Sequence, residues 1–297
     1  MKKIITLAAF LLTGLAALAQ PAMPFMRIDR NPVTAAMGGT ESVSPLYNPA
    51  AVPFAGSSDV LASYQMWAPG TTGSHHANLL AGIKLGEKIG ITALAAYQMG
   101  KPYTIMDASG APGGTFSPNE LMAGLGIGFR FTESLGIGAT VRFASEKLTA
   151  KNSYSTIAGD LLLVYRTNGL TLTGGIASLG TGVADEIAGS NNHLPPTSVR
   201  IGAGYHFDLG EGIINAAVDA DYYLAGGLGG ALGAEYGYKE MVFVRAGAHL
   251  GGQAAPIPTY VSLGAGVKFS GVHLDISFLT LNEIIGNTLT AGIGYEF

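Results

Sequence analysis

The chain has 297 residues, of which 48% are hydrophobic and only 12% are charged, with a formal net charge of −4. A soluble secreted domain carries about a quarter of charged residues, so this surface is too apolar to face water on all sides. The isoelectric point near 5.8 excludes a nucleic-acid partner, because no basic stripe is present to neutralise phosphates. Cysteine is absent while glycine occurs 44 times, so a large hydrogen-bonded sheet must stabilise the chain in place of disulfides.

Residues 1–19 are predicted to form a cleaved signal peptide. Met1-Lys2-Lys3 is a basic start, residues 4–18 are an apolar run, and Ala17-Leu18-Ala19 is a small-residue cleavage site. The apolar run is shorter than the roughly 20 residues that a membrane-spanning helix needs. The mature chain is therefore expected to begin near Gln20, after export through the inner membrane.

Residues 20–57 do not alternate between apolar and polar side chains, and prolines stand at positions 21, 24, 32, 45, 49 and 53. This segment is too irregular to be a membrane strand and too apolar to be a free tail. We expect it to form a plug inside a barrel made by the rest of the chain. The alternative is a tail on the periplasmic side.

Residues 58–297 are predicted to form an all-β fold, a transmembrane antiparallel β-barrel of about fourteen strands. Each segment alternates apolar with small or polar side chains, as a tilted membrane strand requires. In the fifth segment, Leu135 and Val141 lie on one face while Thr140 and Arg142 lie on the other. The expected strands cover residues 58–67, 74–85, 88–98, 119–131, 134–145, 154–166, 169–178, 197–207, 213–224, 228–238, 240–250, 259–269, 271–279 and 287–297.

The links between these segments alternate in length. Short links such as 86–88 and 132–134 fall at every second connection, and most of the others, such as 99–118 and 179–196, are longer. Short periplasmic turns that alternate with longer extracellular loops are typical of barrels in the Gram-negative outer membrane. A soluble β-sandwich would share only the alternation of side chains. We therefore expect outer-membrane lipid around a barrel that its first and last strands close.

The chain ends on Phe297, and Tyr295 lies on the same face of the last strand. A terminal aromatic residue on an amphipathic strand resembles the signal that the barrel-assembly machinery reads in bacterial outer-membrane proteins. We therefore expect Tyr295 and Phe297 to serve as an assembly signal, with that machinery as a partner.

The inward face of the predicted barrel carries charges of both signs. Buried charges persist when they are paired or solvated, so we expect cross-strand ion pairs in a partly wet lumen; a conduction pathway is the alternative. Many other inward positions are glycine, which leaves room for a plug to dock. The expected inward charged and histidine residues are Arg130, Arg142, Asp160, Arg200, His206, Asp219, Asp221, Glu235, Arg245, His249, Lys268, His273, Asp275 and Glu296.

Four short motifs resemble the start of the PorV/PorQ family of Bacteroidetes outer-membrane proteins. They are Ala35-Ala36-Met37-Gly38-Gly39, Asn48-Pro49-Ala50, Pro53-Phe54 and Ser63-Tyr64-Gln65-Met66-Trp67. The family is similar in turn to the FadL-type transporters, which share the Asn-Pro-Ala element ahead of a fourteen-stranded barrel. The resemblance implies a plug motif formed by Met37, Gly38, Gly39, Asn48, Pro49 and Ala50.

The resemblance implies two different roles. PorV-like proteins serve the type IX secretion system and carry cargo protein, whereas FadL-like proteins pass small hydrophobic molecules through a plugged barrel. We expect the first role, with other outer-membrane or secretion-complex proteins as partners; the alternative is transport of a hydrophobic ligand. No catalytic site, cofactor or metal site is expected, because the six histidines are scattered and adjacent His75 and His76 point to opposite faces of a strand.

Overall fold

The first and last strands close the barrel, as the sequence predicts. The computed structural model describes residues 21–71, 73–184, 192–225, 227–252, 255–281 and 286–297, and the predicted signal peptide and Gln20 lie outside them. Fourteen antiparallel strands form one closed sheet, which β1 and β18 complete by pairing with each other. These strands are β1 (Asp59–Trp67), β2 (Ser74–Leu85), β3 (Ile89–Met99), β6 (Asn119–Arg130), β7 (Leu135–Lys147), β8 (Tyr154–Thr167), β9 (Leu170–Gly180), β12 (Ser198–Leu209), β13 (Gly212–Tyr223), β14 (Gly227–Tyr238), β15 (Val242–Gly251), β16 (Tyr260–Phe269), β17 (Val272–Thr280) and β18 (Thr288–Glu296).

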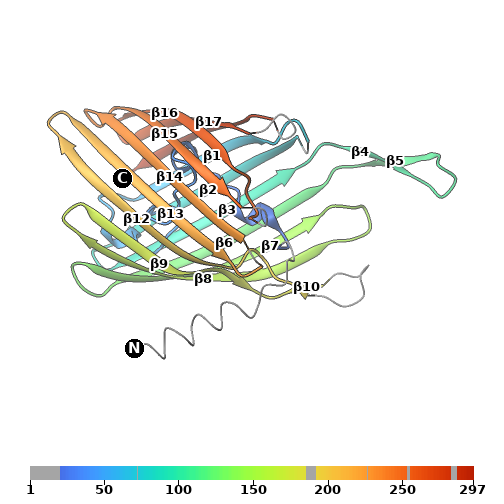
Figure 1. Cartoon of the computed structure of the whole chain (residues 1–297), viewed down its shortest axis with the longest axis horizontal. Coiled ribbons are helices and arrows are strands. Elements are labelled where there is room, and N and C mark those ends of the chain that lie inside the picture. Colours follow the sequence, from blue (N-terminus) through green and yellow to red (C-terminus); the bar gives the residue numbers. More distant parts are fainter. Residues whose placement is uncertain (1–20, 72, 185–191, 226, 253–254, 282–285) are drawn as a thin grey trace.

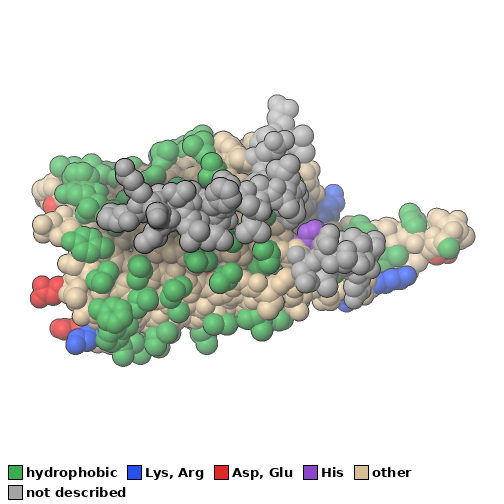
Figure 2. All heavy atoms as spheres, turned by 60° about the horizontal axis from the view of Figure 1, so that its bottom comes forward, with side chains coloured by type: hydrophobic (Ala, Val, Ile, Leu, Met, Phe, Trp, Pro, Cys, Tyr) green, Lys and Arg blue, Asp and Glu red, His purple; other side chains and the backbone are tan. Residues whose placement is uncertain are grey.

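The outer face of the barrel is apolar. Leu125, Val141 and Phe269 point outward and are 68%, 63% and 73% exposed. Figure 2 shows hydrophobic side chains spread over the wall, with Lys, Arg, Asp and Glu side chains gathered at its two ends. Aromatic side chains at the inner end pair with one another on this face, as Phe129 does with Phe131. An apolar band with aromatic residues at its edge is the surface of a barrel that sits in lipid.

The two ends of the barrel differ. The chain's C-terminus and the short turns lie at one end, and a long hairpin projects from the other (Figure 1). The hairpin consists of β4 (Tyr103–Met106) and β5 (Pro112–Phe116). By the outer-membrane pattern of short periplasmic turns, the hairpin marks the outer end and the C-terminus the inner end. The sequence predicted only a loop here, because proline and two glycines break the alternation in β5.

Two further short strands, β10 (Val183–Ala184) and β11 (Asn192–His193), pair with each other outside the barrel sheet.

An irregularity interrupts the wall of the barrel between β8 and β9. The ladder between β8 and β9 shifts register between Gly159 and Leu161, and Ser178 opposite this point has φ 56. The Ser178 amide donates to the Asp160 carboxylate at 2.7 Å, so a side chain replaces the missing backbone partner.

Residues 21–57 lie inside the barrel and contain three short helices. They are η1 (Pro24–Arg27), α2 (Pro32–Ala36) and η2 (Val52–Phe54). The Asn31 side chain accepts a hydrogen bond from the Val33 amide at 2.9 Å and so caps α2. The helix ends before Gly38 and Gly39, whose φ angles of 76 and 88 favour glycine. Among the described residues, no helix has the length and apolar character needed to cross a membrane.

Candidate functional site

Residues 21–57, which we call the plug, run through the lumen from the outer end to the inner end. At the outer end, the Ala22 amide donates to the Leu194 carbonyl oxygen at 2.9 Å, in the loop before β12. At the inner end, the plug leads into Ser58, whose amide donates to the Phe297 carbonyl oxygen at 2.9 Å. The plug therefore spans the length of the barrel, as the ribbon in Figure 1 shows.

The outer part of the plug is apolar. Met23, Phe25, Met26 and Ile28, which we call the apolar tip, are at most 5% exposed. The cavity left near the tip has a volume of about 20 Å³, which is close to the space of one water molecule. The tip therefore closes the lumen at its own level. Wall residues in the same hydrophobic cluster are Ala96, Met122, Ala144, Ala158, Tyr260 and Leu279.

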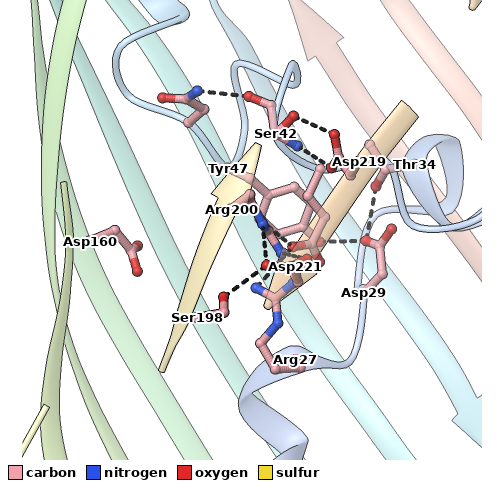
Figure 3. A network of polar contacts seen from close by, with 12 residues as sticks. Arg27, Asp29, Thr34, Ser42, Tyr47, Asp160, Ser198, Arg200, Asp219 and Asp221 are labelled. Atoms are coloured by element: carbon pink, nitrogen blue, oxygen red, sulfur yellow. Dashed lines mark hydrogen bonds and ion pairs between the residues drawn. The ribbon is translucent and has the colours of Figure 1, made fainter. Parts of the chain in front are cut away.

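Buried charges bind the plug to strands β12 and β13 (Figure 3). Arg27 of the plug lies 3.4 Å from Glu41 and 3.4 Å from Asp221. Arg200 contacts the same two carboxylates, at 3.1 Å and 2.9 Å. All four side chains are at most 9% exposed. We call these four residues the charge cluster. Each arginine contacts one carboxylate of the plug and one of the wall, so the cluster ties the plug to the wall.

Burial and the neighbouring charges together raise the pKa of the Glu41 carboxyl. Asp219 lies next to the cluster, so three carboxylates accompany the two guanidinium groups of Arg27 and Arg200. Burial raises the pKa of the Glu41 carboxyl to about 8, against the opposing effect of Arg27, and Asp221 and Asp219 raise it further. The proton that Glu41 keeps at neutral pH removes the excess negative charge.

A second contact beside the charge cluster fixes the middle of the plug. The Ser42 amide donates to the Asp219 carboxylate at 2.9 Å, and the Ser42 hydroxyl donates to the same carboxylate. Thr173 of β9 donates to the Ser42 hydroxyl oxygen at 2.8 Å. Asn48 donates to the Ser42 carbonyl oxygen at 2.7 Å and accepts from the Ala50 amide at 3.0 Å. The Asn48 side chain thus ties the Asn-Pro-Ala turn to the Ser42 anchor.

Asp29 holds the plug in its folded shape. Its carboxylate accepts hydrogen bonds from the Thr34 hydroxyl at 2.9 Å, the Tyr47 hydroxyl at 2.8 Å and the Asn31 amide at 3.0 Å. Burial raises the pKa of Asp29, and the hydrogen bonds from Thr34 and Tyr47 oppose that shift. These contacts join residues up to 18 positions apart, so the plug is a folded unit of its own.

Glycines on the inner wall are the places where the plug backbone touches the sheet. A Cβ atom on Gly128 would lie 1.8 Å from the Pro49 carbonyl oxygen, and one on Gly247 would lie 2.2 Å from the Gly38 nitrogen. Such distances leave no space for any side chain. The inward glycine positions therefore form the docking surface of the plug.

Wall side chains also hold the Met37-Gly38-Gly39 part of the plug motif. Ser262 of β16 accepts from the Gly38 amide at 3.1 Å and donates to the Ala36 carbonyl oxygen at 2.9 Å. His249 of β15 contacts the Gly38 carbonyl oxygen at 3.2 Å, and its ring stacks on that of Tyr260 with centroids 5.2 Å apart. Side chains of the wall thus bond to both the amide and the carbonyl groups of this turn of the plug.

The remaining inward charges brace the wall away from the charge cluster. Arg245 bonds to both Glu235 and Asp275, and the Arg245–Asp275 distance is 2.6 Å. Arg142 bonds to Asp160. These cross-strand pairs lie inside the barrel, in the arrangement that the alternation predicts.

Five more of the inward residues lie nearer the inner end. Lys268 lies 2.6 Å from Glu296, and His273 bridges Asp275 and Asp59 at 2.7 Å and 3.0 Å. Arg130 stacks over the ring of Phe54 at 4.9 Å, while His206 contacts Asn215 at 2.7 Å. Some of the predicted inward residues therefore contact the plug, in the charge cluster or at Ser42, and others form contacts within the wall.

Sequence reasoning missed Arg27, Glu41, Ser42 and Ser262 as contact residues. The available signal was the presence of Arg27 and Glu41 within a segment otherwise too apolar to be free. A charge in such a segment needs a buried partner, and the unmatched acidic residues of the wall could supply one.

Two larger cavities lie at the inner end between plug and wall. One has a volume of about 440 Å³ and is bordered by apolar residues such as Met37, Phe54 and Val164. The other, of about 330 Å³, is more polar and reaches Lys268. Both border Glu235 of β14 and Pro45 of the plug, so they lie next to each other.

The contact between Ser74 and His76 resembles part of a site for nucleophilic chemistry. The Ser74 hydroxyl lies 3.0 Å from Nε2 of His76. The Nδ1 atom of His76 is buried with no hydrogen-bond partner among the described residues, whereas a catalytic dyad needs a group that orients the imidazole. The described residues hold no group of three or more His, Cys, Asp or Glu side chains suited to a metal ion.

The closed sheet, the lipid-facing surface and the internal plug define a Gram-negative outer-membrane β-barrel. Solved structures share this fold. The monoaromatic hydrocarbon channel CymD is 15% identical with a TM-score of 0.62, covering 91% of this chain and 97% of that one. The Ralstonia pickettii toluene transporter TbuX is 13% identical with a TM-score of 0.57, covering 92% and 99%. A Pseudomonas aeruginosa FadL homologue is 10% identical with a TM-score of 0.58, covering 94% and 100%.

At these identities the likeness establishes the fold, so the FadL-like barrel expected from the sequence is confirmed at that level. Comparisons with protein-family models and with curated proteins gave no match. The narrower resemblance to PorV/PorQ proteins, together with its Bacteroidetes source and its link to type IX secretion, has no support from the comparisons.

Proposed function

We propose that the protein is an outer-membrane channel for small hydrophobic molecules, which its plug closes. The observation that carries this proposal is the apolar tip, because a hydrophobic chamber in the lumen is filled by the chain's own Met23, Phe25 and Met26. An apolar chamber inside a barrel favours apolar ligands over ions or sugars. The role that the sequence offered as its alternative is thus the one that the site favours.

The comparisons support the same proposal. CymD is described as a monoaromatic hydrocarbon channel and TbuX as a toluene transporter. The charge cluster and the Ser42–Asp219 contact hold the plug in place on the inner side of the tip. Movement of the tip would open the outer half of the lumen without breaking those contacts, apart from the ones that Arg27 makes.

Toluene binding and uptake test this proposal. Phe25→Ala removes a benzene-sized group from the tip, and apolar cavities of that size bind benzene-like ligands. We expect toluene to bind about tenfold more tightly and to enter cells faster than with the unaltered chain. Trp67, the chain's single tryptophan, packs against the tip cluster, so its fluorescence reports the binding.

Phe129→Ala is the matched control, because Phe129 is 40% exposed on the lipid-facing side and should leave binding and uptake unchanged. If toluene neither bound to the unaltered chain or to Phe25→Ala nor crossed the membrane through them, the channel proposal would be wrong. Equal gains in both variants would show that the tip does not control access.

A secretion-complex role is the second candidate, and the β4–β5 hairpin favours it. The hairpin projects beyond the outer rim (Figure 1) and carries Tyr103 and Met106, which are 39% and 58% exposed. Exposed apolar side chains of this kind suit contact with another protein. Pull-down from solubilised outer membranes should then recover partners that are lost when residues 103–116 are deleted; identical recovery from both chains argues against this role.

We also propose that the protein is not an enzyme. The support is the unpartnered Nδ1 of His76, which leaves the Ser74–His76 contact without an orienting group. Ser74→Ala should therefore leave toluene uptake unchanged, and the purified chain should not hydrolyse ester substrates. Ester hydrolysis that disappears in Ser74→Ala would contradict this.

A further inference from the structure

A cavity of about 350 Å³ lies at the outer mouth of the barrel, at the base of the β4–β5 hairpin. It is separate from the cavities around the plug, because none of its lining residues belongs to the plug. Gln98 and Glu120 lie on its barrel side, and Lys101, Tyr103 and Leu148 lie on its loop side.

The barrel side of this cavity belongs to a row of polar residues. Gln65 on β1 stands opposite His76 on β2, which stands opposite Gln98 on β3. Gln98 stands opposite Glu120 on β6, and Glu120 opposite Glu146 on β7. Opposite residues of neighbouring strands share one face of a sheet. Five adjacent strands thus present polar side chains at one level of the inner wall.

This row contains polar atoms without partners. Among the described residues, no hydrogen bond reaches Oε1 of Gln65, Nδ1 of His76, Oε1 of Gln98 or Oε2 of Glu120, although all four atoms are buried. Gln65 and His76 are 0% and 1% exposed. Buried polar groups of native proteins nearly always have partners, so the unpartnered oxygens of Gln98 and Glu120, which line the cavity, call for an external one.

The two carboxylates of the row lack the ion pair that most other inward carboxylates form. Asp160, Asp221, Asp275, Glu235 and Glu296 each form an ion pair with Arg or Lys. In the part of the chain that the structure describes, neither Glu120 nor Glu146 forms one. Glu120 lines the cavity, and Glu146 stands opposite it on the neighbouring strand. This arrangement attracts a cation from outside, because burial makes an unpaired charge costly.

The loop side of the cavity adds apolar and aromatic surface. The Tyr103 hydroxyl donates to the Leu148 carbonyl oxygen at 3.2 Å, which joins the hairpin to the loop after β7. The Gly100 amide donates to the Pro118 carbonyl oxygen at 2.8 Å and closes the base of the hairpin. The Tyr103 ring also packs edge-on against Phe116, with centroids 5.7 Å apart. This wall suits the body of an organic molecule.

We propose that this cavity binds a small organic cation, with a primary ammonium group at Glu120 and Gln98 and an apolar body against Tyr103 and Leu148. An ammonium group can donate hydrogen bonds to Oε1 of Gln98 and Oε2 of Glu120, the two oxygens that have no partner. Its body fills a volume far larger than a bare metal ion needs, and an aromatic ring beside it favours positive charge. None of the residues that line the cavity belongs to the plug, so the proposal does not rest on the channel function.

Calorimetric titration of the purified full chain in detergent tests the proposal. The probes are 2-phenylethylammonium and the neutral 2-phenylethanol, at pH 7 and low salt. We expect binding of the ammonium compound alone. Glu120→Gln should weaken that binding at least about tenfold, because a charge-assisted hydrogen bond is lost.

Lys101→Met provides a second variant of opposite sign. Lys101 is exposed, so its replacement should not disturb folding, and loss of its positive charge should strengthen ammonium binding by about two- to fivefold. Glu133→Gln, in an exposed turn at the inner end, is the matched control and should leave binding unchanged.

Three outcomes would overturn the proposal. Equal binding of the alcohol would show that charge is not recognised. Unchanged binding in both Glu120→Gln and Lys101→Met would place the probe elsewhere. Calcium chloride alone, if it binds and excludes the ammonium probe at equal concentration, would make this a metal site.

Discussion

Glu41 shows how one residue can couple the plug to its surroundings. It lies between Arg27 of the plug and Arg200 of the wall. With the neighbouring Asp219 added to the charge cluster, three carboxylates face two guanidinium groups, and their charges balance only while Glu41 keeps its proton. An isolated glutamate with a pKa near 4.3 would be ionised at neutral pH. The protonated carboxyl therefore belongs to the docked plug and not to the undocked one.

We expect the docked plug to weaken between pH 6 and pH 9. The pKa of Glu41 is raised to about 8 by burial, so its contribution to stability is complete below about pH 4 and is lost as the pH rises through about 8. The urea midpoint of the Trp67 fluorescence change should be lower at pH 9 than at pH 6. In Glu41→Gln this difference should largely disappear; a midpoint that rose with pH would contradict the assignment.

At the scale of elements, the inner wall and the plug are shaped to each other. Strands β6 and β15 carry glycine where the plug backbone comes closest, at Gly128 and Gly247. Glycine inside a strand costs stability, and the cost is offset by contact with the plug over the same residues. The glycine-rich faces of these strands are thus a consequence of what they enclose.

Gly128→Ala should displace the Asn-Pro-Ala turn. Its new Cβ would lie 1.8 Å from the Pro49 carbonyl oxygen, which is backbone and cannot rotate away. We expect a loss of about 1–3 kcal/mol in plug docking, as for other overpacked sites. Chymotrypsin should then cleave the plug near Tyr47 and Phe54 faster than in the unaltered chain, as N-terminal sequencing of the fragments would show.

Gly174→Ala is the matched control for this substitution. Gly174 lies on β9, and its nearest atom to an added Cβ would be the Arg200 carbonyl oxygen at 3.8 Å, which is ordinary contact. Cleavage of this control at the same increased rate would show that the effect comes from the strands and not from the plug.

The strands could be predicted from the sequence because each carries its own signal. The segment predicted at 88–98 is Ile89–Met99, and that predicted at 154–166 is Tyr154–Thr167. Period-two alternation fixes both the strand and its lipid-facing side. The β4–β5 hairpin lacked this signal, since Gly113 and Gly114 stand where alternation would require side chains.

The contacts of the plug could be predicted only in part. The segment was recognisable by its prolines and its apolar character, but its partners lie far away in the chain. Arg200 and Glu41 are 159 residues apart, and Ser42 and Asp219 are 177 apart. Neither spacing repeats, so no periodic pattern could indicate which wall charge each plug residue would meet.

At the scale of the whole molecule, the seam between β1 and β18 decides whether a barrel exists. Backbone hydrogen bonds between Ser58 and Phe297, at 2.9 Å and 3.0 Å, extend this seam to the last residue. The Phe297 ring is 60% exposed and stacks on Tyr295 with centroids 5.8 Å apart. Backbone and ring thus have separate roles, one in closure and one on the outer surface.

Phe297→Ala should reduce assembly more than stability. Its backbone bonds remain, and an exposed ring contributes little to the free energy of unfolding, within about 0.5 kcal/mol. We expect a clear fall in the fraction of folded barrel in cells, measured by mobility on unheated gels. Refolding of the purified variant in detergent should be nearly normal; an equal loss in both measurements would argue against an assembly signal.

The course of the plug has a consequence for the order of events in biogenesis. Its outer end bonds to Leu194 and its inner end continues into β1, which belongs to the closing seam. A segment tied to both ends of a finished cylinder cannot be threaded through it afterwards without passing down its whole length. We therefore infer that the N-terminal segment folds first and that the strands of the wall then close around it.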